Sequence, residues 1–318
     1  MAALLTIIEA GLQTTVQAAP RLGYRHRGVP WAGPADDLSF AIANHLVGNA
    51  PGEAGLEITM GGFVAGFEAD AVFALTGAPG EATLNGEAVP HHQTHTAHAG
   101  DVLKLAPPKI GMRSYLAFGG RLAADEILGS MATYLPAGLG GFSGRALAAG
   151  DVLHLANGSD SFAQRETPRA LRPYIDHHWT ARCLFGPEAD LLTPADRAAL
   201  QQHPFTIGRR GNRMGVALEG HVFRPQSAGT MRSSPVFPGT IQCPEGGVPF
   251  LLMADAQTTG GYPRIAQVIR ADRHRLGQMR PGDTLSLAMV EPEFGQGAMR
   301  TKAEAVALWM SETLEAVD

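Results

Sequence analysis

Short apolar segments that alternate with polar residues recur along the chain, and turn residues separate them. This pattern is typical of β-strands that bury one face. In the first half, the predicted strands cover residues 4–9, 11–17, 56–59, 63–67, 71–76, 82–84, 100–105 and 113–118. In the second half, they cover residues 180–185, 205–207, 249–254 and 282–287, and residues 233–244 are predicted to form a turn and a strand. The chain is therefore predicted to be mainly β.

One sequence pattern, Gly-Asp-x-Leu-x-Leu, occurs three times, beginning at Gly100, Gly150 and Gly282. In each copy a Gly-Asp turn leads into an alternating strand. The copies at 100 and 282 suggest two similar β-domains in tandem. We expect four segments, which are an N-terminal domain at 1–160, a polar linker at 161–176, a second domain at 177–295 and a C-terminal helical tail at 296–318.

Helix signals are few. Asp37 is expected to cap a helix over residues 38–47. The segment Thr193–Asp196 has the capping-box pattern, with proline at the first helical position, and predicts a short helix. Residues 299–317 carry an amphipathic pattern, typical of a helix that packs on the body of a protein.

Composition narrows the functional classes. The 39 glycines and 22 prolines among 318 residues favour turns over long helices. The net charge of -5 and the lack of any lysine or arginine run argue against nucleic-acid binding. No apolar run is long enough for a membrane helix, and the first residues lack a basic signal-peptide region. We expect a cytoplasmic protein.

Metal binding has little support. Cys183 and Cys243 are far apart and have no CxxC companion, so neither a disulfide framework nor a zinc site is indicated. The histidine-rich segment 91–98 contains no cysteine, aspartate or glutamate. Because a strand would place its histidines on two faces, we predict a solvated loop and no metal site.

The most informative stretch runs from Leu251 to Arg264. An apolar strand stops there in a polar loop, which presents Asp255 and Gln257 at its rim. The pair Gly260-Gly261 lets a backbone approach a ligand closely, although it is also ordinary turn punctuation. Two further loops are expected nearby, one presenting Asn212 and Arg213 and one carrying Gln242 on a neighbouring strand.

Several motifs in chain order carry a resemblance to a known family. They are residues 11–17, 41–49, 56–59, 75–78, 111–117, 212–215, 238–242 and 253–264, the last reading Asp-Ala-Gln-Thr-Thr-Gly-Gly-Tyr-Pro at its centre. Together they resemble the allophanate hydrolase subunit 2 family, also described as biotin-dependent carboxyltransferase-like. The pattern is most similar to the branch formed by the C subunits of bacterial 5-oxoprolinases, and it covers residues 4 to 290.

The resemblance implies two tandem cyclophilin-like β-barrel domains. It also implies a hydrolase complex with the B and A subunits of 5-oxoprolinase, which opens the cyclic amide 5-oxo-L-proline to L-glutamate with ATP as co-substrate. One position departs from the family pattern. Where the family has Gln-Asp-x-Gly-Arg, this chain keeps Gln17 and Arg21 but has Ala18 in place of the acid. That loss leaves open whether activity is impaired or the substrate differs.

Such chemistry needs cations for a carboxylate or phosphate and a group that orients water. We expect Asp255 to act as acid/base or orienting residue, with Arg213 and Gln257 also in catalytic roles. The expected substrate-binding residues are Gln242, Thr258, Thr259, Gly260, Gly261, Tyr262, Arg264, Asn212, Arg21 and Arg145.

Two other functions stay open. The first is carboxyl transfer from carboxybiotin to urea or a similar amide; the chain has no biotinyl-lysine motif, so biotin would come on a partner. The second is a non-catalytic regulatory binder related to kinase-inhibitor antagonists, which the missing acid at Ala18 favours slightly.

Overall fold

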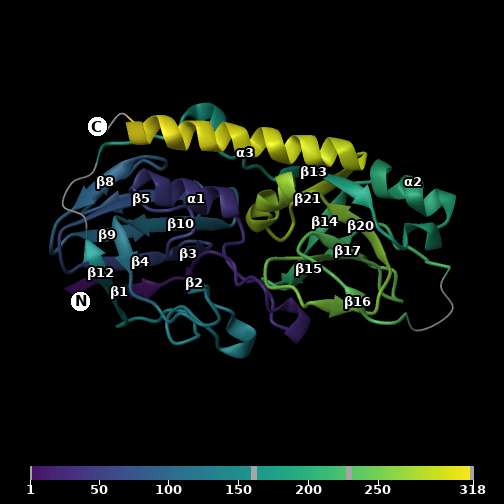
Figure 1. The fold of residues 1–318 in the computed structure, drawn as a ribbon, viewed down its shortest axis with the longest axis horizontal. Helices are drawn as coiled ribbons and strands as arrows, with labels where there is room; N and C mark the ends of the chain where they lie inside the picture. The colour runs from purple at the N-terminus through teal and green to yellow at the C-terminus, as the bar shows by residue number, and fades with distance from the viewer. Residues whose placement is uncertain (1, 159–162, 227–230, 316–318) are drawn as a thin grey trace. The chain divides into compact units, whose positions relative to one another are not determined.

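The computed structural model describes residues 2–158, 163–226 and 231–315, and its strands and helices are labelled in Figure 1. The chain forms two compact units. Unit 1 comprises Met1–Leu22, Ala32–Ile175 and Val306–Asp318, and unit 2 comprises Gly23–Trp31 and Asp176–Ala305. A short strap, Gly23–Trp31, thus belongs to unit 2 although unit 1 precedes and follows it in the sequence.

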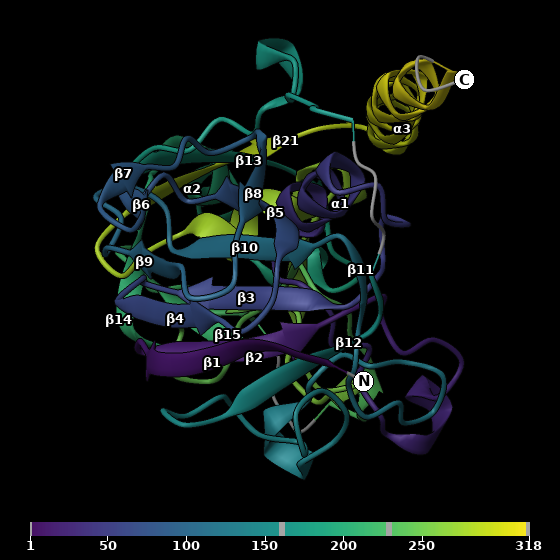
Figure 2. The same cartoon turned by 90° about the vertical axis from the view of Figure 1, so that its left-hand side faces the viewer.

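Unit 1 contains two sheets. Seven strands pair in the order β11-β12-β1-β4-β9-β6-β7 and five in the order β2-β3-β10-β5-β8. The strands are β1 (Ala2–Ala10), β2 (Gln13–Gln17), β3 (Gly55–Thr59), β4 (Phe63–Phe67), β5 (Ala71–Gly77), β6 (Ala82–Leu84), β7 (Glu87–Ala88), β8 (Thr94–Ala97), β9 (Val102–Leu105), β10 (Arg113–Phe118), β11 (Gly120–Leu122) and β12 (Val152–Gly158). Figure 2 shows β1, β4, β3 and β10 one above another.

The core of unit 1 lies where the buried faces of both sheets meet. Strand β4 alternates, so Phe63, Ala65 and Phe67 face the core while the residues between them are half-buried. Strands β3 and β10 are buried along their whole length. The helix α1 (Asp37–Leu46) packs on β5 and β10, which explains why these strands have no solvent face.

The helix α1 begins one residue earlier than its sequence pattern predicts. Its N-cap is Asp36, whose side chain accepts hydrogen bonds from the Ser39 amide at 2.9 Å and from the Ser39 hydroxyl at 2.5 Å. The predicted cap, Asp37, is the first helical residue. Asp36 lies three positions before Ser39, whose hydroxyl adds a second hydrogen bond that Phe40, three positions after Asp37, has no group to provide.

Unit 2 is built on a closed barrel with the strand order β13-β20-β17-β18-β15-β14-β21. Strands β13 and β21 pair in parallel and the other neighbours are antiparallel. The barrel strands are β13 (His178–Phe185), β14 (Phe205–Gly211), β15 (Gly215–Glu219), β17 (Thr240–Gln242), β18 (Phe250–Leu252), β20 (Arg264–Val268) and β21 (Thr284–Met289). Outside the barrel, β16 (Ser234–Pro235) pairs with β19 (Thr259–Gly260).

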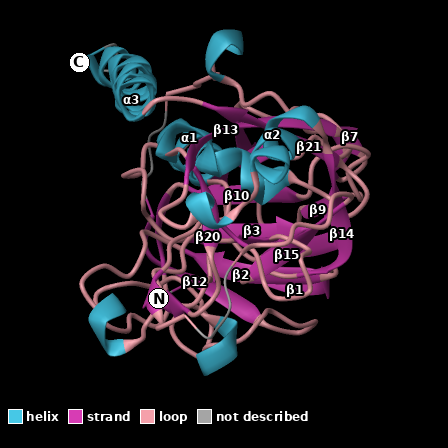
Figure 3. Ribbon diagram, turned by 90° about the vertical axis from the view of Figure 1, so that its right-hand side faces the viewer, coloured by secondary structure: helices cyan, strands magenta, loops and turns pink. Residues whose placement is uncertain are grey.

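Helical segments are short except for the last. They are α2 (Pro194–Gln202), α3 (Pro292–Glu315) and the 3-10 segments η1 (Arg25–Arg27), η2 (Leu135–Ala137), η3 (Arg169–Leu171), η4 (Ala189–Leu191) and η5 (Arg270–Gln278). Helix α2 is capped as predicted, because the Thr193 hydroxyl accepts the Asp196 amide at 3.1 Å. Figure 3 shows that strands and loops dominate over helices.

The three Gly-Asp repeats share one turn. In each, the glycine has a positive φ, at 94°, 89° and 91°, which glycine adopts without a steric penalty. The aspartate carboxylate accepts the backbone N–H three residues before it, at 2.7, 2.8 and 2.9 Å, from His98, Ala148 and Arg280. Strands β9, β12 and β21 follow as predicted. The repeat therefore forms a turn before each strand, and its aspartate side chain accepts a hydrogen bond from a backbone N–H of the same turn.

The predicted mainly β fold with a C-terminal helix is confirmed. The closed barrel belongs to unit 2, whereas the strands of unit 1 form two hydrogen-bonded sheets around a core. Helix α3 begins at Pro292, earlier than Met299, and the predicted end at Val317 lies outside the described residues. So do residues 161 and 162 of the predicted linker. None of the described helices is both long and apolar enough to span a bilayer.

Candidate functional site

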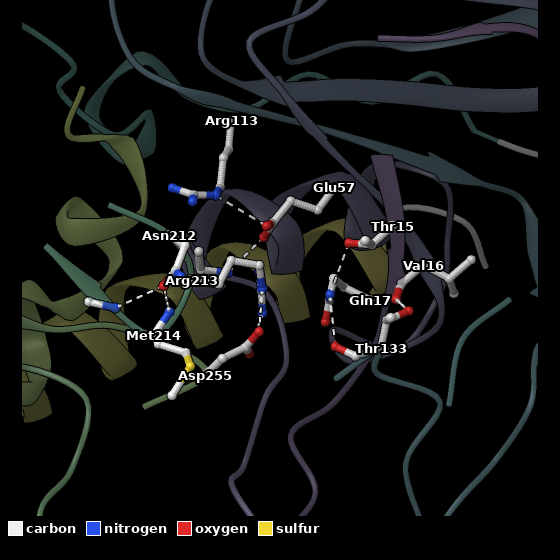
Figure 4. A network of polar contacts seen from close by, with 12 residues as sticks. Thr15, Val16, Gln17, Glu57, Arg113, Thr133, Asn212, Arg213, Met214 and Asp255 are labelled. Atoms are coloured by element: carbon white, nitrogen blue, oxygen red, sulfur yellow. Dashed lines mark hydrogen bonds and ion pairs between the residues drawn. The ribbon is translucent and has the colours of Figure 1, made fainter. Parts of the chain in front are cut away.

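The two loops that carry the predicted chemistry are tied together by a buried ion pair (Figure 4). Arg213 Nε donates to Asp255 Oδ2 and Arg213 Nη2 to Asp255 Oδ1, both at 2.9 Å. The Asp255 amide donates to the Arg213 carbonyl at 2.7 Å. Both side chains are at least 95% shielded from water. A planar guanidinium that meets a carboxylate through two bonds fixes orientation as well as distance.

The Arg213 loop is shorter than predicted. Residues 208–211 continue strand β14 instead of forming a loop, so the connection to β15 is only Asn212, Arg213 and Met214. The Asn212 side-chain oxygen accepts the amides of Met214 at 2.7 Å and Gly215 at 3.4 Å. This Asx turn forms the tight loop without further residues.

A pocket of about 480 Å³ opens beside this loop, and we define it as the amide pocket. Its polar groups come from Arg210, Asn212 and Gln257, and its apolar wall from Met214 and Phe250. Guanidinium and amide N–H groups that converge on an apolar pocket can bind a carboxylate and stabilise negative charge developing on a carbonyl oxygen. Arg210 and Phe250 were not predicted as site residues. The exposed basic run at the end of β14 was the only signal for Arg210, and Phe250 had none beyond its place in a predicted strand.

The side-chain amide of Gln257 is oriented by the side-chain amide of Gln242. Gln257 Nε2 donates to Gln242 Oε1 at 3.4 Å, and Gln242 Nε2 donates to the Tyr262 carbonyl at 3.2 Å. Gln242 is buried and pairs with Phe250 on the adjacent strand β18, so the two strands lie side by side as predicted. At Gly260 an added Cβ would lie 2.5 Å from Gln242 Nε2, so glycine leaves room for the Gln242 amide. Tyr262 is half exposed.

The strap residue Arg25 supports the same loop, although it was not among the predicted catalytic or substrate-binding residues. Its guanidinium lies 4.8 Å from the ring centres of both Trp31 and Phe237. Its Nη2 donates to the Val236 carbonyl and, at 3.3 Å, to the Thr258 carbonyl. Burial lowers the pKa of Arg25. The strap therefore clamps the backbone at Thr258, one residue beyond Gln257.

The guanidinium of Arg264 is already paired with the Glu188 carboxylate. Two of its guanidinium nitrogens donate to Glu188, at 2.8 and 2.6 Å, and a third donates to the Pro235 carbonyl at 2.9 Å. The paired guanidinium lowers the pKa of Glu188. Thr259 and Gly260 pair with the two residues of β16, and Gly261 follows them. These residues shape the far end of the loop and do not line the amide pocket.

Arg21 and Arg145 belong to unit 1. Arg21 is fully buried and donates to the carbonyls of Ile127, Ser130 and Ala132 at 2.8, 3.3 and 2.9 Å. Arg145 makes an exposed fork with Asp151, at 2.7 and 2.8 Å, and is not among the residues that line the amide pocket.

The first-loop motif serves a structural purpose in unit 1. Gln17 donates to the Thr133 carbonyl at 3.3 Å and to the Thr15 hydroxyl at 3.0 Å. Ala18, where the family pattern has an acid, is 3% exposed. Gln17 and Arg21 thus fix the segment 127–133, and the Ala18 side chain is enclosed in the protein.

A second buried network lies in unit 1, and Figure 4 shows its central pair. Arg113 lies 3.2 Å from a Glu57 carboxylate oxygen. The Tyr115 hydroxyl donates to Glu57 at 2.9 Å and accepts the Asp36 amide at 2.8 Å, and the Ala35 amide donates to Glu57 at 2.8 Å. Burial, followed by the charge of Glu57, raises the pKa of Tyr115. These residues fall within or beside the quoted motifs, but no role was predicted for them.

The histidine-rich segment is not the solvated loop that was predicted, because residues 94–97 form strand β8 on the edge of a sheet and His92 is buried. His91 Nε2 bonds the Gly80 carbonyl at 3.0 Å and His95 Nε2 the Pro90 carbonyl at 2.7 Å. Within residues 2–158, 163–226 and 231–315, no group of three or more metal-binding side chains is present. Cys183 and Cys243 are buried thiols that form no disulfide, and burial raises the pKa of Cys243 to about 11.

A family model and two relatives of known name match most of this chain. A family model described as "Carboxyltransferase domain, subdomain A and B" matches residues 27–289. The chain is 39% identical to the C subunit of the Escherichia coli 5-oxoprolinase over 284 residues, which cover 89% of this chain and 90% of that protein. It is 34% identical to the Haemophilus influenzae protein of the same name over 287 residues, which cover 90% of this chain and 91% of that protein.

A larger protein shares the fold. The crystal structure of the Kluyveromyces lactis urea amidolyase superposes with a TM-score of 0.91 at 27% identity, covering 96% of this chain. The matched region is 20% of that chain, so the present sequence corresponds to about a fifth of the urea amidolyase.

Proposed function

Because the chain belongs to the family of the carboxyltransferase domain, subdomains A and B, we propose that it is the C subunit of an ATP-dependent 5-oxoprolinase complex. The observation that carries this proposal is its 39% identity to a 5-oxoprolinase C subunit across nine-tenths of both chains. The complex would hydrolyse the cyclic amide bond of 5-oxo-L-proline and release L-glutamate. The A and B subunits, as partners, belong to the same proposal.

The chemistry explains why the amide pocket suits this substrate. Amide resonance protects the lactam carbonyl, so transfer of the ATP γ-phosphoryl group to the carbonyl oxygen would activate the carbon for attack by water. ADP leaves in that transfer. After the first water attacks, the ring C–N bond breaks, the nitrogen takes a proton, and a second water releases the phosphoryl group as inorganic phosphate, which leaves the carboxylate of L-glutamate. We propose that Arg210 binds the substrate carboxylate and that Asn212 and Gln257 donate to the lactam oxygen.

Asp255 and Arg213 receive a different role from the one expected for them. Each is the other's buried partner, and breaking the pair to bind substrate would leave an uncompensated charge. We therefore propose that they position the two loops, as Gln242 positions Gln257. ATP is proposed as a co-substrate of the complex with no site assigned in this chain, since the sequence has no Gly-Lys-Ser/Thr phosphate loop. A reducing cytoplasm fits two buried, unpaired thiols.

Reconstitution tests the proposal. The chain is combined with the A and B subunits of 5-oxoprolinase, and 5-oxoproline-dependent ATP hydrolysis is measured. We expect the double variant Asn212→Ala/Gln257→Ala to lower kcat/KM by about a hundredfold, because two hydrogen bonds to the reacting oxygen are lost. Arg145→Ala is the matched control and should retain activity. Activity that is independent of this chain would refute the proposal.

A second candidate is carboxyl transfer to urea or a similar amide, which the TM-score of 0.91 with the urea amidolyase supports. It predicts urea-dependent carboxylation with carboxybiotin supplied on a partner. The amide donors of Asn212 and Gln257 would bind urea equally well, so substrate dependence decides between the two activities. A chain with neither activity would fit the regulatory binder.

A further inference from the structure

A second pocket in unit 2 lies between the first half of α3 and the barrel, and we define it as the α3 pocket. Its volume is about 600 Å³, within the range of small-molecule sites. One side is formed by the end of β20 and the start of η5, and the other by the face of α3. It shares no lining residue with the amide pocket.

The chemistry of the α3 pocket combines an apolar wall with cations. Val268, Ile269 and Met299 supply apolar surface, and arginines supply the charge. Arg270 and Arg300 have no hydrogen-bond or ion-pair partner among the described residues, and no acidic residue lines the pocket. In a chain with a net charge of -5, this local excess of positive charge favours an anion.

The pocket is held open by contacts on both sides of it. Near its start, α3 is held by Phe294, whose ring lies 5.6 Å from the Arg182 guanidinium. One turn beyond the pocket centre, Lys302 Nζ donates to the Ala271 carbonyl at 3.2 Å. Met299 and Arg300 lie between these anchors, and Ala303, one residue beyond Lys302, continues the same helical face. Ligand binding would therefore need little rearrangement.

We propose that the α3 pocket binds a small amphipathic carboxylate. The hydrocarbon part would contact Val268, Ile269 and Met299, and the carboxylate would accept hydrogen bonds from Arg270 and Arg300. This site is separate from the proposed 5-oxoprolinase chemistry and does not depend on it.

Calorimetric titration of octanoate into the full chain tests the site. Octanamide is the comparator, because it has nearly the same shape without the charge. We expect saturable octanoate binding and at least tenfold weaker octanamide binding, the ratio for losing charge-assisted hydrogen bonds. Binding of both compounds with equal affinity, or no saturable octanoate binding, would overturn the proposal.

Variants locate the binding. Arg270→Ala/Arg300→Ala should weaken octanoate binding at least tenfold by removing the charge, and Ala303→Trp should do so by filling the pocket. Arg232→Ala, an exposed arginine elsewhere in unit 2, is the matched control and should bind normally. Thermal unfolding without ligand establishes whether each variant is folded. If Ala303→Trp does not fold, the test rests on the double arginine variant alone. Unchanged affinity in the folded arginine variant would exclude this pocket.

Discussion

Both units bury an arginine beside a carboxylate, but the two pairs are built differently. In unit 2, Arg213 and Asp255 meet through two hydrogen bonds of 2.9 Å and join two loops. In unit 1, Arg113 lies 3.2 Å from Glu57, which is shared with the phenol of Tyr115. The first pair is a two-bond fork between loops. The second is one member of a network centred on paired strands β3 and β10.

The difference lies in what surrounds each pair. Asn212 and Met214, which flank Arg213 in the sequence, line the amide pocket. Ser114, beside Arg113, is fully buried and donates to the Ala78 carbonyl at 2.8 Å. A buried ion pair by itself therefore does not identify a catalytic acid. In unit 2 the pair fixes the loops, and the neighbouring exposed side chains are the ones available to a ligand.

The largest effect is expected from breaking the unit 2 fork. Asp255→Ala should lower the free energy of unfolding by about 3–5 kcal/mol, because Arg213 would remain as an uncompensated buried charge. Urea denaturation measures this loss, and turnover of the reconstituted complex should fall with it.

A double variant separates positioning from catalysis. Arg213→Met/Asp255→Leu removes both charges and should recover most of the stability. If Asp255 only positions the loops, partial turnover should return with stability. A stable double variant with no turnover would instead support the acid/base role for Asp255.

Breaking the unit 1 pair should be less costly and should spare the pocket. Glu57→Gln keeps the shape of the side chain and should destabilise by about 2–3 kcal/mol, since charge-assisted bonds to Arg113 and Tyr115 are weakened. Urea denaturation checks the loss. The KM for 5-oxoproline should stay unchanged, and a large rise in KM would show that this network contributes to substrate binding.

Adding a side chain at Gly260, next to the Gln242 amide, should affect substrate binding more than stability. In Gly260→Ala, the new methyl group would lie 2.5 Å from Gln242 Nε2 and should displace the amide that orients Gln257. We expect KM to rise about tenfold, which corresponds to about 1.4 kcal/mol. Steady-state kinetics measures it. Gly246→Ala is the control, because its added Cβ meets no atom within 4 Å.

The smallest effect concerns acid sensitivity of unit 1. Burial lowers the pKa of both His45 and His92 from 6.5 to about 4. The unfolded chain therefore binds more protons than the folded chain between pH 6.5 and pH 4, and stability falls as the pH falls through that window. At pH 5.5 each histidine should cost about 1 kcal/mol relative to neutral pH.

His92→Asn tests this contribution. Asparagine tolerates the positive φ of 65° at this position. The stability lost between pH 7.5 and 5.5, measured by urea denaturation, should shrink by about 1 kcal/mol. An unaltered slope in His92→Asn would remove this histidine from the explanation.

The sequence by itself determined the features whose causes are local. Alternating residues predicted strands such as Phe63–Phe67, the Thr193 capping box predicted α2, and the Gly-Asp repeat predicted the entry to three strands. Each depends on hydrogen bonds or burial within a few residues, so the pattern carries the information. The polar loop after Leu252 and the position of Gln242 beside it followed from the same reasoning.

Only the tertiary structure decided how those loops work. Residues 42 positions apart, Arg213 and Asp255, turn out to neutralise each other, and Arg264 is paired with Glu188. Arg25 reaches Thr258 across more than two hundred residues. Long-range pairing is set by barrel register and chain reversal, which leave no local pattern. The stretch for which catalysis was predicted is a loop held by the Arg213–Asp255 and Arg264–Glu188 pairs, and its half-buried Gln257 lines the pocket.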